Sequence, residues 1–151
     1  MHSPHRARGD QMNNILEVKN LNKVFEIKKF LKKSLNLKAL SDVSFILGQN
    51  ETLGIVGESG CGKSTLAKVL TQLEIETSGE IELLGKKYRD YKSREFHSLI
   101  QMVFQDPYQS LNPRKKAFDI IADPLRINTD KSEEEIRELV YSMMKKVGLR
   151  A

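Results

Sequence analysis

Residues 57–65 read Gly-Glu-Ser-Gly-Cys-Gly-Lys-Ser-Thr, which fits the phosphate-binding pattern Gly-x-x-x-x-Gly-Lys-Ser/Thr. An apolar run at 53–56 precedes this loop, and a helical pattern at 66–70 follows it. The loop therefore lies between a predicted strand and a predicted helix, which is the setting that the motif requires. Because pattern and context agree, the stretch predicts binding of a nucleoside triphosphate rather than a glycine-rich turn with a chance Lys-Ser pair.

Each residue type in the loop has a physical reason to be there. Glycines let the backbone take positive φ, so that successive N–H groups converge on an anion. The helix that begins near Lys63 adds unpaired N–H groups and the positive end of its dipole. We expect Lys63 to reach the β- and γ-phosphates and the Ser64 hydroxyl to ligate Mg²⁺. The predicted nucleotide-binding residues of the loop are Gly57, Glu58, Ser59, Gly60, Cys61, Gly62, Lys63, Ser64 and Thr65.

Composition indicates one ordinary globular domain. The 151 residues are 39% hydrophobic and 30% charged, which is enough for a real core. A formal net charge of +5 is too small an excess to decide for an anionic partner, and no nucleic-acid partner is predicted. The polar residues 1–14 lack the apolar segment of a signal peptide, and no run of 18 apolar residues occurs. A single cysteine, Cys61, favours a cytosolic, reducing location.

Local patterns predict alternating strands and helices. Ser132-x-x-Glu135 is a capping box that opens a helix, and Gly148 is its expected stop. Asp123 could be mistaken for the acid at the end of a strand, but Pro124 predicts a helix end there instead. Strands are predicted at 15–18, 24–27, 43–47, 53–56, 81–84 and 100–104, the fourth of them buried on both faces, and helical segments at 64–73, 93–98 and 117–122.

Two separated segments carry a family resemblance. They are LGIVGESGCGKSTL at 53–66 and MVFQDPYQSLNPR at 102–114. Together they resemble the ATP-binding subunits of oligopeptide and dipeptide ABC transporters, and the similarity extends from about Leu16 through Leu149. The resemblance implies an α/β fold: a P-loop NTPase core, incomplete here, with N-terminal antiparallel β strands and the start of the ABC helical subdomain. The implied divisions are a polar N-terminus at 1–14, the ATPase core at 15–112 and the beginning of the helical subdomain at 113–151.

The resemblance also assigns roles outside the loop. Gln105 corresponds to the family glutamine that contacts Mg²⁺ or the nucleophilic water and couples the site to the membrane subunit. The implied catalytic residues are therefore Lys63 and Gln105, and Ser64 and Gln105 would hold Mg²⁺ through the nucleotide. Family members stack an aromatic side chain on the adenine ring, for which Phe25 is the candidate. Phe30 is a rival, and simple packing of either ring is the plain alternative.

The implied function is that of a peripheral subunit on the cytoplasmic face of the inner membrane. It would bind ATP and Mg²⁺ and energise import of dipeptides or oligopeptides. The implied partners are a second ABC ATPase subunit in a head-to-tail dimer, membrane permease subunits and, indirectly, a peptide-binding protein. The cargo rests on resemblance alone, because family neighbours carry nickel or sugars, and a homodimer and a heterodimer both stay open.

Hydrolysis needs residues that the chain does not display. The family's Leu-Ser-Gly-Gly-Gln signature, its Walker B strand ending in Asp-Glu and its switch histidine are not identifiable before Ala151. We therefore expect the chain to be the N-terminal part of a longer ATPase. The alternatives are a truncated, non-hydrolysing nucleotide-binding fragment and a P-loop small-molecule kinase.

Three further features have a plain interpretation beside a functional one. The basic segment 28–33 could touch anionic lipid headgroups, but a solvated hairpin tip is the simpler prediction. Cys61 could be redox-active at a helix N-terminus, but a small side chain filling a variable position of the motif is favoured. His97 is expected to be an exposed histidine, because no other metal-ligand type clusters near it.

Overall fold

The computed structural model describes residues 14–27, 35–106 and 110–149, which form two compact units. One unit runs as far as Met102, and the other begins at Val103. None of the helices in these described ranges has the length and apolar character needed to cross a bilayer. The division into an ATPase core and a helical subdomain after residue 112 stays a prediction.

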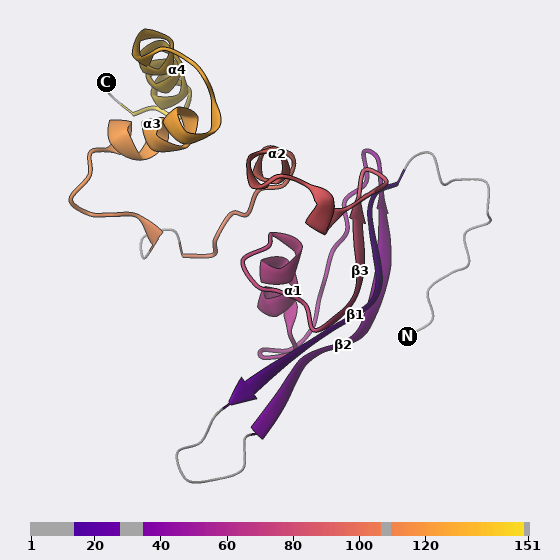
Figure 1. Cartoon of the computed structure of the whole chain (residues 1–151). Coiled ribbons are helices and arrows are strands. Elements are labelled where there is room, and N and C mark those ends of the chain that lie inside the picture. Colours follow the sequence, from indigo (N-terminus) through magenta and orange to yellow (C-terminus); the bar gives the residue numbers. More distant parts are fainter. Residues whose placement is uncertain (1–13, 28–34, 107–109, 150–151) are drawn as a thin grey trace. The chain divides into compact units, whose positions relative to one another are not determined.

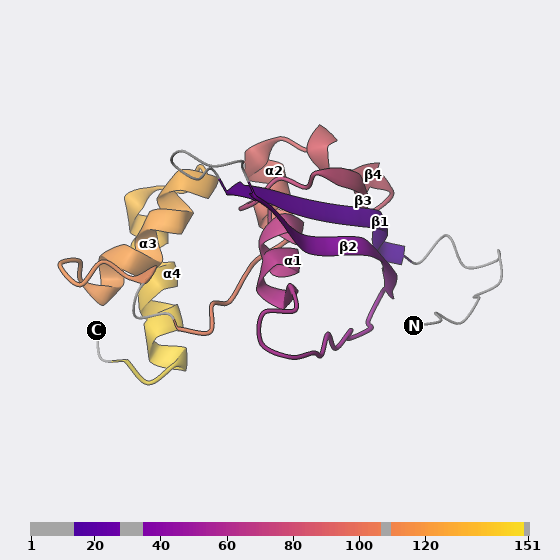
Figure 2. The ribbon, with the colours of Figure 1, turned by 90° about the horizontal axis from the view of Figure 1, so that it is seen from below.

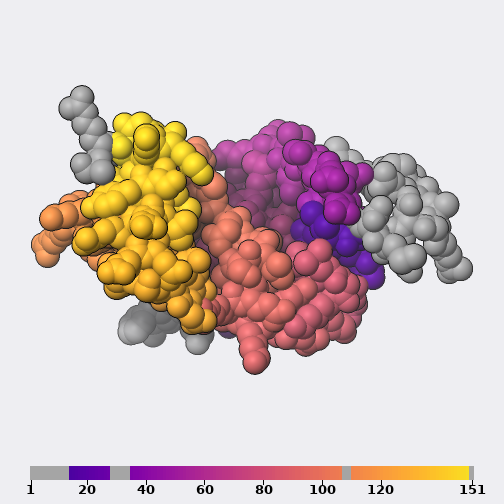
Figure 3. Space-filling model, turned by 90° about the horizontal axis from the view of Figure 1, so that it is seen from above, coloured from indigo at the N-terminus to yellow at the C-terminus, as the bar shows by residue number. Residues whose placement is uncertain are grey.

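An antiparallel sheet with strand order β2-β1-β3-β4 forms the frame of the first unit. In Figure 3, the indigo atoms of β1 lie between purple and red parts of the surface. Because β1 has a neighbour on each side and β2 has only β1, β2 is an edge strand of this sheet. The strands are β1 (Asn14–Ile27), β2 (Leu35–Gly48), β3 (Ser78–Leu83) and β4 (Lys86–Lys87).

A single long strand replaces two that the sequence predicted separately, at 15–18 and 24–27. Side-chain hydrogen bonds carry β1 through the intervening polar residues. The side-chain amide of Asn20 donates to Asp42 Oδ1 at 2.6 Å, and the Asn20 backbone N–H donates to Ser44 Oγ at 2.8 Å. These bonds hold β1 to β2 where the register of the pair shifts, as at a β-bulge.

Two helices, α1 (Lys63–Leu70) and α2 (Ser93–Leu99), lie on the same side of the sheet (Figure 1). Figure 2 shows α1 against the strands in a second view. The helices predicted at 64–73 and 93–98 are confirmed, although α1 ends at residue 70. Apolar side chains of the strands and of both helices form one buried core. Full burial of a Leu, Val or Ile side chain is worth about 1.5–3 kcal/mol, so this core fixes α1 on the sheet. The core consists of Leu16, Val18, Leu21, Leu40, Leu66, Val69, Ile81, Leu83, Tyr88 and Phe96.

Two predicted strands are wrong. Segment 53–56 has no strand structure, and its Val56 is 92% exposed. Segment 100–104 has none either, and Val103 is 96% exposed. An apolar strand is stable only when neighbouring strands take its backbone hydrogen bonds and a packed layer covers its side chains. No described strand pairs with either segment, so the apolar pattern is present without the burial that it predicts.

A polar cluster is buried beside the short 3₁₀ helix η2 (Tyr88–Asp90). The Tyr88 hydroxyl donates to the carboxylate of Glu76, whose side chain is 4% exposed and also pairs with Arg89. Burial, followed by the hydrogen bond to Glu76, raises the pKa of Tyr88 to about 12. Tyr88 therefore stays protonated and donates this hydrogen bond at any physiological pH.

Helices α3 (Ala117–Asn128) and α4 (Glu133–Lys146) pack together in the second unit. The predicted helix end at Pro124 is wrong, because Pro124 lies inside α3. A proline removes one backbone hydrogen bond, yet Ala122 and Leu125 on either side of it pack onto α4. Tertiary packing therefore continues the helix six residues past the predicted segment 117–122.

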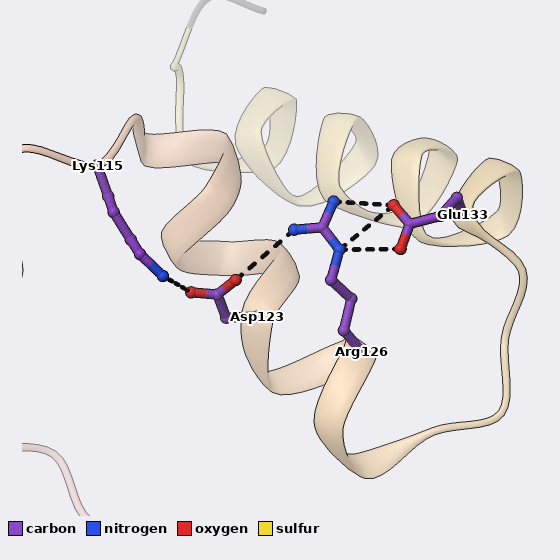
Figure 4. A network of polar contacts seen from close by, with 4 residues as sticks. All are labelled: Lys115, Asp123, Arg126 and Glu133. Carbon is purple, nitrogen blue, oxygen red and sulfur yellow. Dashed lines mark hydrogen bonds and ion pairs between the residues drawn. The ribbon is translucent and has the colours of Figure 1, made fainter.

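Charged side chains join the end of α3 to the start of α4 (Figure 4). Arg126 donates three hydrogen bonds to Glu133, from Nη2 to Oε2 at 2.8 Å and from Nε to Oε1 at 2.9 Å and to Oε2 at 3.3 Å. Asp123 lies between Lys115 and Arg126 and pairs with both. Hydrogen bonds from Arg126 and Lys115 hold the pKa of Glu133 and Asp123, respectively, below their ordinary values.

The predicted capping box at the start of α4 is confirmed. The Ser132 hydroxyl accepts from the Glu135 backbone N–H at 3.3 Å, and the Glu135 carboxylate accepts from the Ser132 N–H at 2.8 Å. Gly148, with φ of +75°, follows the last turn as predicted.

Candidate nucleotide-binding site

The Gly57–Thr65 loop lies entirely within the first unit and leads directly into α1. Gly62 is the N-cap residue of α1, and its carbonyl accepts the Leu66 N–H at 2.8 Å. Its φ is +100°, and a β-carbon built on it would lie 2.4 Å from the Ala39 carbonyl oxygen. Only glycine satisfies both conditions, so Gly62 sets how closely the loop approaches β2.

The N-terminus of α1 offers hydrogen-bond donors to an anion. The N–H groups of the first helical residues, Lys63, Ser64 and Thr65, have no acceptor within the helix because of their position. The first turn of α1 carries no acidic side chain that would compete for these donors or for the helix dipole. The Ser64 side chain is exposed and Thr65 is half-buried.

The Lys63 ammonium lies against the loop rather than in open solvent. Its Nζ donates to the carbonyl oxygens of Gly57 and Glu58, at 2.7 Å each, and lies 3.4 Å from Cys61 Sγ. The Glu58 carbonyl also accepts the Cys61 N–H, at 3.3 Å, which closes a turn beside the cation. An ammonium in this place can exchange neutral carbonyl acceptors for charged phosphate oxygens, which form stronger hydrogen bonds.

Cys61 occupies a confined position although its side chain is exposed. Its Sγ lies 2.6 Å from the point where a β-carbon on Gly57 would stand. The sulfur therefore fills the space between the first glycine of the loop and Lys63. This placement agrees with the simpler interpretation of Cys61, that of a small side chain fitted to the motif.

Alkylation of Cys61 is expected to block nucleotide binding, because an added group would occupy the space beside the Lys63 ammonium. Saturable ATP binding should fall by about tenfold or more after complete modification with iodoacetamide. Cys61→Ala carried through the same treatment should bind ATP as before. Undiminished ATP binding by the fully modified protein would refute the expectation.

The other predicted site residues belong to different elements. Gln105 is exposed and belongs to the second unit, whereas the loop belongs to the first. Phe25 is half-buried in β1, where the Lys23 ammonium lies 4.5 Å from its ring centroid. Phe30 and the basic segment 28–33 lie outside the described residues.

His97 and the cavities provide no second site of comparable chemistry. His97 is half-buried rather than exposed, because its ring packs against Phe96 with centroids 5.4 Å apart. The described ranges contain no group of three or more His, Cys, Asp or Glu side chains arranged to hold a metal. Two cavities of about 310 and 400 Å³ lie around Tyr88 and Arg89, and no phosphate-loop residue lines them.

Comparison with known proteins assigns the family. The sequence profile of the ABC transporter family matches residues 40–151. The chain belongs to the ABC transporter family. It is 46% identical over 143 residues to the di/tripeptide transport ATP-binding protein DppF of Pseudomonas aeruginosa, covering 92% of this chain and 44% of that protein. It is 50% identical over 142 residues to the dipeptide transport ATP-binding protein DppF of Haemophilus influenzae, covering 91% and 43%.

A solved ABC cassette has a similar fold. The dimeric, post-hydrolysis structure of the ATP-binding cassette MJ0796, bound to ADP and Pi, superposes with a TM-score of 0.70 at 27% identity. The match covers 89% of this chain and 58% of the cassette. Of the two DppF relatives, this chain spans less than half the length. The α/β fold and the family predicted from the sequence are confirmed.

Two contacts near the candidate site residues were not predicted from the sequence. The contact of Gly62 with the Ala39 backbone joins segments 23 residues apart, and no local pattern indicates it. The contact of Lys23 with Phe25 had a signal, since residues two apart on a strand share a face. The contact was not predicted, because in the sequence Lys23 resembles an ordinary solvated lysine.

Proposed function

We propose that this chain is the nucleotide-binding part of an ATPase subunit that energises import of dipeptides or oligopeptides. The observation that carries the proposal is the Lys63 ammonium, held over a glycine loop at the start of α1. A cation and the N–H groups at the N-terminus of a helix together suit the phosphates of ATP. The family assignment supports ATP over other anions.

Each residue of the loop has a role in this proposal. The backbone of Gly57–Gly62 and the first N–H groups of α1 bind the phosphates, and Lys63 compensates the charge on the β- and γ-phosphates. The Ser64 hydroxyl and the Gln105 side-chain oxygen are hard ligands of the kind that Mg²⁺ takes. Mg²⁺ held by these residues would supply positive charge that offsets the charge of the phosphates. Phe25 would stack on the base.

Position along the hairpin supports Phe25 as the residue that receives the base. Phe25 pairs with Leu37 of β2, and Gly62 approaches β2 two residues further on, at Ala39. Ala39 lies where the register of the β1–β2 pair shifts, between the partners of Lys23 and Val24. The base of a nucleotide whose phosphates lie at the loop therefore has the Phe25 ring within its reach.

The names of two relatives support a role in peptide transport. The two relatives are named as di/tripeptide and dipeptide transport ATP-binding proteins, which is the basis for proposing peptides as cargo. In this proposal the longer protein hydrolyses ATP, pairs with a second ATPase subunit and docks on membrane permease subunits that receive peptide from a binding protein. Its place would be the cytoplasmic face of the inner membrane, as a peripheral subunit.

Uptake of a radiolabelled dipeptide by cells tests this role. Cells whose gene carries Lys63→Ala should import the dipeptide at less than about a tenth of the normal rate, because phosphate binding is lost. Uptake of an unrelated labelled amino acid is the control and should not change. Normal dipeptide uptake, or a defect confined to nickel or a sugar, would contradict the proposed cargo.

A further inference from the structure

Lys23 is an unusually enclosed lysine for a residue on a strand at the surface. Its side chain is only 12% exposed, and its ammonium donates to the Ile75 carbonyl at 2.7 Å and pairs with the Glu74 carboxylate at 3.1 Å. Both partners follow α1 in the chain, so they tie this point of β1 to the body of the unit. The third neighbour of the ammonium is the ring of Phe25, whose centroid is 4.5 Å away.

The face of β1 that carries Lys23 and Phe25 is the face on which α1 lies. Lys23 pairs with Leu40 of β2, and Leu40 is buried in the core with Leu66 of α1. Directly paired residues share a face, and residues two apart on one strand share it too. Phe25 is therefore one step beyond the packed core, on the side that the phosphate loop also occupies.

Among residues 14–27 and 35–48, the strands of this hairpin pack loosely around Phe25. Beyond Asn22, β1 pairs with β2 alone, because its pairing with β3 ends there. The strand ends extend past α1 in Figure 1. On the same face, Ile27 is 41% exposed and Leu37 is 51% exposed, so neither is packed tightly enough to fix a neighbour. The Lys23 ammonium, 4.5 Å from the ring centroid, lies over one face of the Phe25 ring.

We propose that Lys23 is a positioning residue for the bound nucleotide, acting by holding one face of the Phe25 ring so that the other face receives the base. The inference rests on the proposed nucleotide site and adds a residue to it. Lys23 does not touch the nucleotide. It fixes the Phe25 ring before the nucleotide binds. The ring then loses no further conformational freedom on binding, and this entropic cost does not lower the affinity.

The test compares two ligands that differ in having a base. The full chain is titrated with ATP and with inorganic tripolyphosphate, each with Mg²⁺. Lys23→Met keeps most of the buried stem and removes the charge, so ATP affinity should fall about fivefold while tripolyphosphate affinity stays within about twofold. Lys23→Arg, which keeps a cation, should restore ATP affinity. Lys19→Met, an exposed lysine on the same strand that pairs with Glu17, is the matched control and should change neither.

A double-mutant cycle shows whether Lys23 acts through Phe25. In a Phe25→Leu background, Lys23→Met should cause no further loss of ATP affinity. A fivefold loss in that background, an equal loss for both ligands, or no loss for ATP would each overturn the positioning role.

Two further results keep the test decisive. If Lys23→Met does not fold, Lys23→Gln, which keeps an N–H donor for the Ile75 carbonyl but removes the charge, should weaken ATP by about fivefold and leave tripolyphosphate within about twofold. Unchanged ATP affinity in Lys23→Gln would then count against the inference. Failure of the unaltered chain to bind either ligand would overturn the proposed nucleotide site itself, which is a separate outcome.

Discussion

Lys63→Ala is expected to weaken binding of ATP with Mg²⁺ by about a hundredfold. The Lys63 ammonium now donates to two loop carbonyls, of Gly57 and Glu58, and in the complex it would donate to charged phosphate oxygens. Hydrogen bonds that involve a charged group contribute roughly 1.5–3 kcal/mol each, so the loss of about two corresponds to roughly 3 kcal/mol or more. Titration calorimetry at fixed ionic strength measures the difference.

A lysine on the same helix provides the control for this variant. Lys68 is exposed and lies in the last turn of α1, more than one helical turn after Lys63. Lys68→Ala removes the same charge and should leave ATP affinity within about twofold, since exposed charges at this distance are screened. Equal losses in the two variants would mean that net charge, rather than a cation at the loop, controls binding. In the longer ATPase that we propose, hydrolysis of ATP at the normal rate by the Lys63→Ala variant would refute the site.

Among alanine substitutions of the loop glycines, Gly62→Ala is expected to reduce the stability of the protein most. It places a β-carbon 2.4 Å from the Ala39 carbonyl oxygen and forces a non-glycine residue to φ of +100°. The backbone strain alone costs about 1–3 kcal/mol, and the clash must be relieved by moving α1 away from β2. We expect a loss of about 3 kcal/mol or more in the free energy of unfolding, together with loss of measurable ATP binding.

Gly54→Ala is the matched control, because it adds the same methyl group a few residues upstream. A β-carbon on Gly54 has no heavy atom within 4 Å, and its φ lies outside the left-handed region. The change should alter the free energy of unfolding by less than about 0.5 kcal/mol. Urea denaturation of the two variants gives the comparison. Similar stability of Gly62→Ala and the unaltered protein would show that the loop does not depend on the approach to Ala39.

Short-range signals predicted the helices well. The capping box at Ser132 and Glu135 forms as predicted, and Gly148 takes positive φ after the last turn of α4. Such features depend on residues three or four apart, so their geometry follows from the chain itself. The wrong helix end at Pro124 has the opposite origin. There, a local rule was overridden by the packing of Ala122 and Leu125 on α4.

Apolar patterns predicted strands that do not form. Segments 53–56 and 100–104 have the composition of buried strands, yet Val56 and Val103 are almost fully exposed. A pattern of apolar residues states what would be buried if neighbours were present, whereas a strand exists only when those neighbours supply hydrogen bonds and cover. β1 shows the reverse case, in which the long-range bonds from Asn20 to Asp42 and Ser44 make one strand out of two predicted ones.

The candidate phosphate site could be predicted from the sequence. Glycines at fixed spacing, followed by Lys63 and Ser64 at a helix start, predict such a site because its donors are backbone groups and near neighbours in the chain. Tertiary structure decided where that site stands and what braces it. The contact of Gly62 with Ala39 and the enclosure of Lys23 by Glu74, Ile75 and Phe25 join residues that only the packed sheet brings together. Contacts of this kind depend on packing between distant segments, which residue spacing does not encode.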